Sequence, residues 1–128
     1  MSTNRNIPPK PLAVVIDDEF IIRELATSVL EDMNFETMGF TTADEAIGFI
    51  RQHHDAIKVV YTDIRMPGRL DGEALAREVA QRYPTVKVII SSGHVRLQEQ
   101  DPRDGTIFMA KPWAPADLKR LLEGNNDD

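Results

Sequence analysis

The stretch Leu12-Ala-Val-Val-Ile-Asp-Asp-Glu19 decides the fold, because a continuous run of apolar residues stops abruptly at three acids. Such a run is typical of a central strand in a parallel sheet that is covered by helices on both faces. Residues 58–61 and 86–90 have the same character. Residues 36–40 and 106–110 are less continuous, and we expect them at the edges of the sheet.

Between the strands, apolar residues recur at steps of three and four, which places them on one face of a helix. The first such segment covers residues 22–33. The second begins at Thr42, with Glu45 at the spacing of a capping box, and the third follows Gly72 and ends at Pro84. These three segments are predicted to be amphipathic helices.

Two further helices are expected towards the C-terminus. The fifth opens near Pro115, a residue that the first helical turn tolerates. The fourth, residues 95–100, is weak because Val95 and Leu97 are its only apolar residues. Five strand-then-helix units predict an α/β fold with a doubly wound, five-stranded parallel sheet and five helices on both faces.

Length and composition restrict the class of protein. The chain has 128 residues, of which 41% are hydrophobic, so one domain is expected over residues 12–123, between a flexible segment 1–11 and a frayed acidic tail 124–128. The absence of Cys excludes disulfides and thiolate metal sites. No stretch approaches the ~20 apolar residues of a membrane span, so we expect a cytoplasmic protein with no membrane contact. The net charge of −6 argues against direct binding of nucleic acid.

Polar side chains stand at the ends of four predicted strands. Asp17 and Asp18 follow the first strand, and Asp63, Ser92 and Lys111 come at the ends of the third, fourth and fifth. In sheets of this kind, ligands bind beyond the carboxyl ends of the strands. Crowded carboxylates repel each other, and a hard cation with oxygen ligands relieves that repulsion. Mg²⁺ fits better than Zn²⁺, because neither Cys nor clustered His is available.

These residue types favour phosphoryl chemistry. A carboxylate beside Mg²⁺ can attack phosphorus and form an acyl phosphate, provided that cations neutralise the charge on the phosphoryl oxygens. Lys111 would supply one of those cations, and the Ser92 hydroxyl could donate a hydrogen bond to a third oxygen. Gly93 leaves space for the phosphoryl group.

The chain resembles the receiver domains of bacterial two-component response regulators, the CheY-like superfamily, over roughly residues 12–122. Four segments occur in the order and spacing of that family: Val-Ile-Asp-Asp-Glu at 15–19, Thr-Asp-Ile-Arg-Met-Pro-Gly at 62–68, Ile-Ile-Ser-Ser-Gly at 89–93 and Lys-Pro-Trp at 111–113. The resemblance implies a flavodoxin-like sheet of strand order 2-1-3-4-5.

The resemblance also implies roles for individual residues. Asp63 would be the phosphoacceptor, and Asp17, Asp18, Asp63 and the backbone carbonyl of Arg65 would hold Mg²⁺. Ser92 resembles the switch hydroxyl, Lys111 the lysine that pairs with the phosphoryl group, and Phe108 the aromatic switch. The bond between Lys111 and Pro112 is expected to be cis. The loop after Met66-Pro67 is one residue longer than the commonest family pattern.

The function that the resemblance implies is a phosphorylation-controlled binding module. It would accept a phosphoryl group from a histidine kinase or a histidine phosphotransfer protein, slowly hydrolyse its own aspartyl phosphate, and signal to an output protein or effector domain. The partner face would combine residues 95–100, the fifth strand and the fifth helix. A stand-alone regulator and a receiver taken from a larger hybrid kinase or effector-bearing regulator are both compatible with the sequence.

Two rival functions can be weighed. A haloacid-dehalogenase-like phosphatase also uses an Asp nucleophile, Mg²⁺ and Lys, but its second acid, two residues after the nucleophile, is an Asp, whereas Asp17 is followed by Glu19 at that position. A degenerate receiver that only binds proteins is disfavoured by the intact set of site residues.

Overall fold

A computed structural model describes residues 10–64, 71–93 and 106–124. The described residues form five strands: β1 (Leu12–Ile16), β2 (Glu36–Phe40), β3 (Ile57–Asp63), β4 (Lys87–Ser92) and β5 (Thr106–Ala110). They also form α1 (Phe20–Asp32), α2 (Ala43–His53), α3 (Gly72–Arg82) and α4 (Pro115–Gly124). The helix predicted over residues 95–100 lies outside the described residues, so α4 corresponds to the predicted fifth helix.

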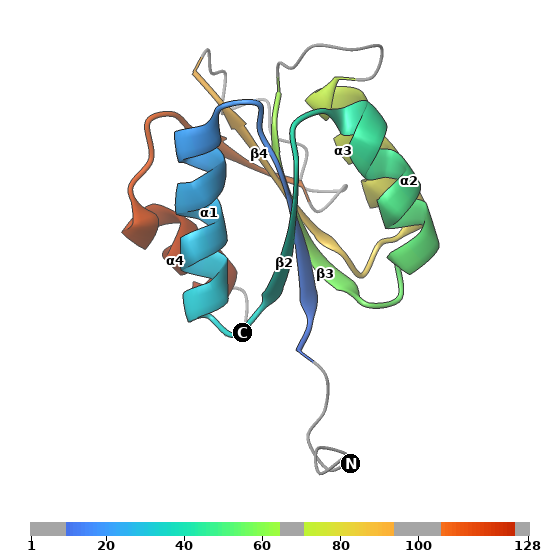
Figure 1. Ribbon diagram of the computed structural model, residues 1–128, viewed down its shortest axis with the longest axis horizontal. Helices are drawn as coiled ribbons and strands as arrows, with labels where there is room; N and C mark the ends of the chain where they lie inside the picture. Colours follow the sequence, from blue (N-terminus) through green and yellow to red (C-terminus); the bar gives the residue numbers. More distant parts are fainter. Residues whose placement is uncertain (1–9, 65–70, 94–105, 125–128) are drawn as a thin grey trace, which may run out of the picture.

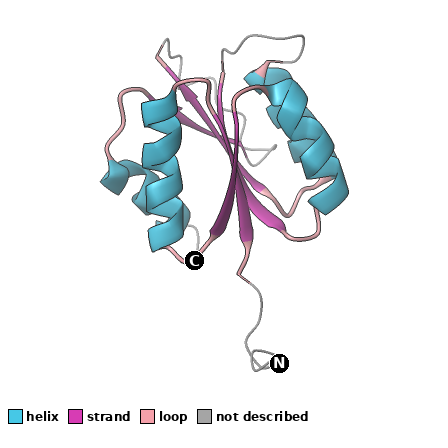
Figure 2. Ribbon diagram, in the orientation of Figure 1, coloured by secondary structure: helices cyan, strands magenta, loops and turns pink. Residues whose placement is uncertain are grey.

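All the strand pairs are parallel, and the sheet order is β2-β1-β3-β4-β5, which confirms the predicted topology. Helices α1 and α4 cover one face of the sheet, and α2 and α3 cover the other (Figures 1 and 2). Each face has its own apolar core, and alternate residues of β1 supply both, since Val14 and Ile16 pack towards α2 and α3 while Ala13 and Val15 pack towards α1 and α4.

Helices α2 and α3 begin at residues whose side chains cap them. The Thr42 hydroxyl accepts a hydrogen bond from the Glu45 amide at 3.2 Å, which satisfies one free donor at the start of α2. The Glu45 carboxylate accepts from the Thr41 hydroxyl at 3.2 Å. At the start of α3, the Asp71 carboxylate accepts from the Ala74 amide at 2.8 Å. The capping prediction for Thr42 is therefore confirmed.

Strands β3 and β4 extend further than the apolar runs indicate. Asp63 pairs with Ser91 across these strands, and Ser92 pairs with Ala110 of β5. The backbone pairing continues through polar residues because they are still flanked by neighbouring strands. The candidate site residues of β3 and β4 are consequently the last residues of strands and are fixed by the sheet.

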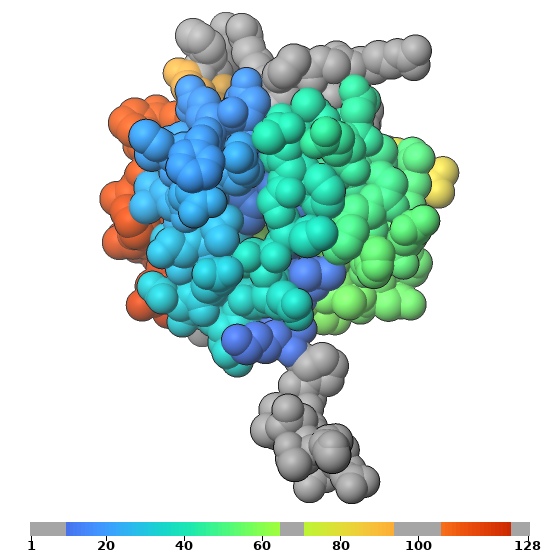
Figure 3. Space-filling view, viewed as in Figure 1, coloured from blue at the N-terminus to red at the C-terminus, as the bar shows by residue number. Residues whose placement is uncertain are grey.

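Strand β2 is one of the two edges of the sheet, opposite β5, and is the more exposed of the two. Thr37 and Phe40 are partly buried, the other three residues are exposed, and Met38 is 42% exposed. In the space-filling view, the residues around β2 lie at the surface beside α1 (Figure 3). In the described part of the chain, no helix is both long enough and apolar enough to cross a membrane.

Candidate functional site

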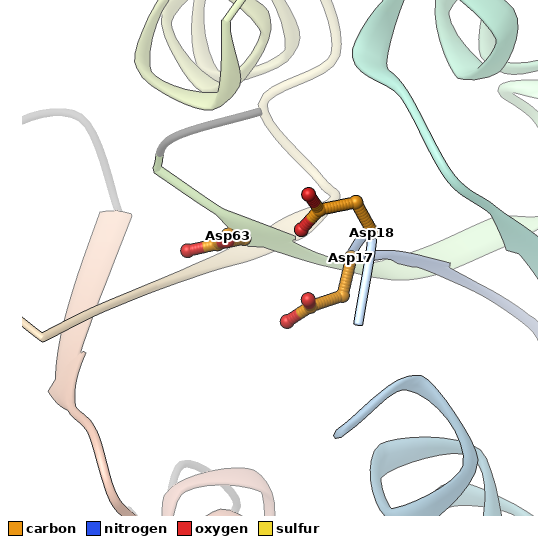
Figure 4. Close-up of side chains that lie close together, drawn as sticks. All are labelled: Asp17, Asp18 and Asp63. Carbon is orange, nitrogen blue, oxygen red and sulfur yellow. The ribbon is translucent and has the colours of Figure 1, made fainter. Parts of the chain in front are cut away.

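Three carboxylates meet beyond the ends of β1 and β3. Asp17, Asp18 and Asp63 can each place one oxygen so that all three oxygens lie within 4.8 Å of one another. Their side chains point into the same space next to the strand ends (Figure 4). Asp17 and Asp63 are buried, at 0% and 8% exposure, whereas Asp18 is exposed. The sequence predicted this cluster, and the structure brings its three members together.

Asp17 is held by its own backbone neighbourhood. Its Oδ1 accepts a hydrogen bond from the Glu19 amide at 2.9 Å, and its carbonyl oxygen accepts from Arg23 Nη1 at 2.8 Å. Burial raises the pKa of Asp17 above its usual range, although the Glu19 amide and the Lys111 amine act in the opposite direction. The cluster therefore carries a desolvation cost that a bound cation would relieve.

The amine of Lys111 lies among the acids. Its Nζ is 3.3 Å from Asp17 Oδ2, 3.4 Å from Asp63 Oδ1 and 3.7 Å from Glu19 Oε1. Burial lowers the pKa of Lys111, but attraction to Asp17 and Asp63 outweighs burial, so that the pKa lies above its usual value. Lys111 therefore stays charged at neutral pH, as pairing with a phosphoryl group requires.

The turn after β5 fixes the position of Lys111. Its backbone amide donates to the carbonyl of Ser92 at 2.9 Å, which ties the ends of β4 and β5 together. The peptide bond between Lys111 and Pro112 is cis, as the resemblance implies. The next residue, Trp113, is buried and donates from Nε1 to the Tyr61 hydroxyl at 3.1 Å.

The two predicted switch residues lie on neighbouring strands. Ser92 is buried at the end of β4, beside Asp63 and Lys111 in the sheet order. Phe108 of β5 pairs with Ile90 and is partly buried against the core under α2 and α3. Arg65, whose carbonyl was predicted to be a metal ligand, and the longer loop that follows Met66-Pro67 lie outside the described residues.

Gly72 is a site residue whose role the sequence did not reveal. A Cβ at this position would lie 1.8 Å from the backbone oxygen of Asp63, and the Gly72 amide donates to the carbonyl of Ile64 at 3.2 Å. The start of α3 therefore packs directly on the backbone that carries Asp63. The sequence places Gly72 only at a helix start, because a contact between distant backbones leaves no periodic signal.

The donor set fits Mg²⁺. The three clustered side chains offer only carboxylate oxygens, which Mg²⁺ prefers, and the described residues bring neither His nor Cys into the cluster. Lys111 offers a fixed positive charge at the same edge, in addition to any bound cation. The arrangement can hold a cation and a phosphoryl group side by side.

Comparison with known proteins identifies the family of the chain. The family model for the response regulator receiver domain matches residues 13–123. The C4-dicarboxylate transport transcriptional regulatory protein DctD of Rhizobium meliloti is 35% identical over 107 residues, which cover 81% of this chain and 23% of that protein. The DNA-binding transcriptional regulator NtrC of Klebsiella pneumoniae is 31% identical over 67% of this chain and 18% of its own length. The chain thus spans less than a quarter of these relatives.

Solved structures show the same fold. The receiver domain of NtrX from Brucella abortus is 34% identical, has a TM-score of 0.74, and is matched over 88% of this chain and 95% of its own. A response regulator receiver protein from Sinorhizobium medicae gives a TM-score of 0.78 at 27% identity, over 93% of this chain and 98% of its own. With the family model matching most of its length, the chain belongs to the response regulator receiver domain family.

Proposed function

We propose that Asp63 is the phosphoacceptor of this receiver domain. The observation that carries the proposal is the position of Lys111 Nζ, 3.4 Å from Asp63 Oδ1 and 3.3 Å from Asp17 Oδ2. A nucleophilic carboxylate, a fixed cation and a second buried acid then share one strand edge. This is the constellation that phosphoryl transfer to an Asp requires, since its transition state spreads negative charge over the phosphoryl oxygens.

Each residue of the candidate site has a defined task in the proposed reaction. An Asp63 oxygen attacks phosphorus while the bond to the leaving group breaks. The Lys111 amine and the Ser92 hydroxyl bind phosphoryl oxygens, and burial of Asp63 limits access of water to the product. Asp17, Asp18 and Asp63, together with the carbonyl of Arg65, would hold Mg²⁺, which would neutralise further phosphoryl charge.

The donor is a histidine kinase or a histidine phosphotransfer protein. The output is a protein contact at β5 and α4, together with the predicted helix over residues 95–100, which lies outside the described residues, and Ser92 and Phe108 are the switch. We place the receiver unit at residues 12–123, in the cytoplasm, with no direct contact to nucleic acid or membrane. The activities of DctD and NtrC belong to those longer proteins, so a stand-alone regulator and a part of a larger regulator or hybrid kinase both fit this proposal.

The direct test is labelling by acetyl phosphate in the presence of Mg²⁺. Asp63→Asn keeps the shape of the side chain and removes the nucleophile, so labelling is expected to fall to background. Asp55→Asn is the matched control, because the Asp55 side chain is 97% exposed and precedes the start of β3, whereas Asp63 is at the other end of that strand. Intact-mass measurement on folded protein checks both, and undiminished labelling of Asp63→Asn would place the acceptor elsewhere.

The same reaction separates the rival functions. A receiver takes up at most one phosphoryl group per chain and releases phosphate slowly, whereas a haloacid-dehalogenase-like phosphatase turns over many molecules of a small phosphomonoester. A degenerate receiver takes up none. Stoichiometric labelling without turnover is the outcome expected here.

A further inference from the structure

A pocket lies near the starts of β3 and β4, at the end of the sheet opposite to Asp63. It has a volume of about 290 Å³ and opens on the face of the sheet that α1 and α4 cover (Figure 1). Six residues line it: Met33, Phe35, Lys58, Val59, Lys87 and Leu122. Four of them are apolar and two are lysines, so apolar surface and two positive charges meet in one small space.

A β-bulge brings the first lysine to this face of the sheet. Ile57 and Val59 pair with successive residues of β1, so Lys58 is an extra residue between them. Ile57 and Val60 pack into the core under α2 and α3, whereas Val59 packs into the core under α1 and α4. Two consecutive residues, Lys58 and Val59, therefore lie on the side of α1 and α4. A regular strand would point the Lys58 side chain away from the pocket.

The second lysine is partly buried without an acid beside it. Lys87 pairs with Val59, and its Nζ donates to the backbone carbonyl of Leu121 at 3.4 Å, which is long for a hydrogen bond. Within the described part of the chain, neither Lys87 nor Lys58 forms an ion pair. Burial lowers the pKa of Lys87 below its usual value. A lysine that loses hydration is usually paired with an acid, so an anion in the pocket would compensate for that loss.

The nearby helix ends restrict the charge of that anion. Helix α1 ends at Asp32 and α4 at Gly124, close in sequence to the pocket residues Met33 and Leu122. The C-terminal end of a helix carries partial negative charge, which repels a dianion such as a phosphate more strongly than a carboxylate. The apolar walls favour a compact hydrocarbon part attached to the charge.

We infer that this pocket binds a small organic monocarboxylate. The carboxylate accepts charge-assisted hydrogen bonds from Lys58 and Lys87, and the hydrocarbon part packs against Phe35 and Leu122. The site does not depend on the proposed role of Asp63, because Asp63 stands at the far end of β3. A ligand here contacts α4 directly through Leu122, which gives the domain a small-molecule input besides the phosphoryl group.

Three probes that carry the same ring separate the effect of charge from that of the apolar part. They are benzoate, the neutral benzamide and phenyl phosphate. Backbone amide NMR shifts of the unmodified chain, recorded without Mg²⁺, give the Kd of each probe. Benzoate should bind about tenfold more tightly than benzamide, as expected for charge-assisted hydrogen bonds, and more tightly than phenyl phosphate. The shifts should centre on Met33, Val59 and Leu122.

Variants assign the preference for benzoate over benzamide to the two lysines. Lys87→Gln should remove most of this preference, and Lys58→Gln should lower it, whereas Lys58→Arg keeps the charge and should retain it. Lys119→Gln is the matched control, because Lys119 is an exposed residue of α4 that does not line the pocket. A packing defect alone would weaken both probes equally and leave the preference unchanged.

Four results would overturn the assignment. They are equal binding of benzoate and benzamide by the unmodified chain, an unchanged preference in Lys87→Gln, tighter binding of phenyl phosphate than of benzoate, and the absence of benzoate-induced shifts at the pocket residues.

Discussion

At the scale of single residues, Gly72 has the most sharply defined requirement. A Cβ there would lie 1.8 Å from the oxygen of Asp63, which is backbone and cannot rotate away. Gly72→Ala is therefore expected to lower the free energy of unfolding by about 2 kcal/mol or more and to slow labelling, since overpacking displaces either α3 or Asp63. Denaturant unfolding together with acetyl phosphate labelling checks this.

A second glycine serves as the control for Gly72. Gly48 lies within α2, is exposed, and has nothing within 4 Å of a Cβ. Gly48→Ala is expected to raise the free energy of unfolding by about 0.5–1 kcal/mol, because Gly in a helix interior costs conformational entropy. If both variants changed stability in the same direction, the close approach at Gly72 would not control this site.

At the scale of elements, α2 and α3 are joined by a two-bond ion pair. Arg51 donates from Nε and Nη2 to the two carboxylate oxygens of Glu78, both at 2.9 Å. Hydrogen bonds from Arg51 hold the pKa of Glu78 below its usual value. The contribution of this ion pair to the free energy of unfolding is therefore fully present above pH 4.5, and it is lost as the pH falls through the lowered pKa of Glu78. Glu78→Gln should lower Tm at pH 7 by a small amount, and this difference should shrink in acid.

The control for this ion pair lies in the same helix. Glu73 is 3.5 Å from Arg77 within α3, and both side chains are more than half exposed. Glu73→Gln should change Tm less than Glu78→Gln does at pH 7, because exposed pairs within one helix contribute little. Thermal unfolding followed by circular dichroism at pH 7 and below pH 4.5 measures both. A Tm difference for Glu78→Gln that persisted unchanged in acid would contradict the assigned role.

The elements also show what the sequence can and cannot predict. Strands β1, β2 and β5 have the predicted bounds, and for β1 the reason is that burial under helices on both faces dictates a continuous apolar run. Strands β3 and β4 run on into Asp63 and Ser92, since backbone pairing does not depend on side-chain polarity. The carboxylate cluster was predictable because Asp17 and Asp18 directly follow an apolar run and Asp63 stands at the end of another. The contacts of Gly72 and of Tyr61 with Trp113 were not, because each joins positions that are distant in sequence.

At the scale of the whole molecule, metal binding is coupled to folding. The desolvated acids cost stability in the absence of a cation, so Mg²⁺ that binds only the folded chain should stabilise it. The expected gain is about 2.7 kcal/mol at a Mg²⁺ concentration one hundred times Kd. Asp18→Ala should weaken this response and leave the metal-free chain at least as stable, because it removes one of three repelling charges. Thermal unfolding across a Mg²⁺ titration measures both quantities.

Two controls accompany the Mg²⁺ titration. Ca²⁺ tests selectivity for the size of the ion, and Asp32→Ala tests a general effect of net charge, because Asp32 is exposed at the end of α1. Asp32→Ala should leave the Mg²⁺ response intact. An equal Mg²⁺ response in Asp18→Ala and the unmodified chain would remove Asp18 from the proposed ligands.

The contact of Lys111 with three acids has one more consequence. A single ammonium group is shared by Asp17, Glu19 and Asp63, each within 4 Å. In the resting domain, the lysine thus acts as an internal counter-ion that neutralises part of the negative charge of these acids before a phosphoryl group binds. An arriving phosphoryl group competes for a cation that is already in position, so occupancy of the site amounts to an exchange of partners around one amine.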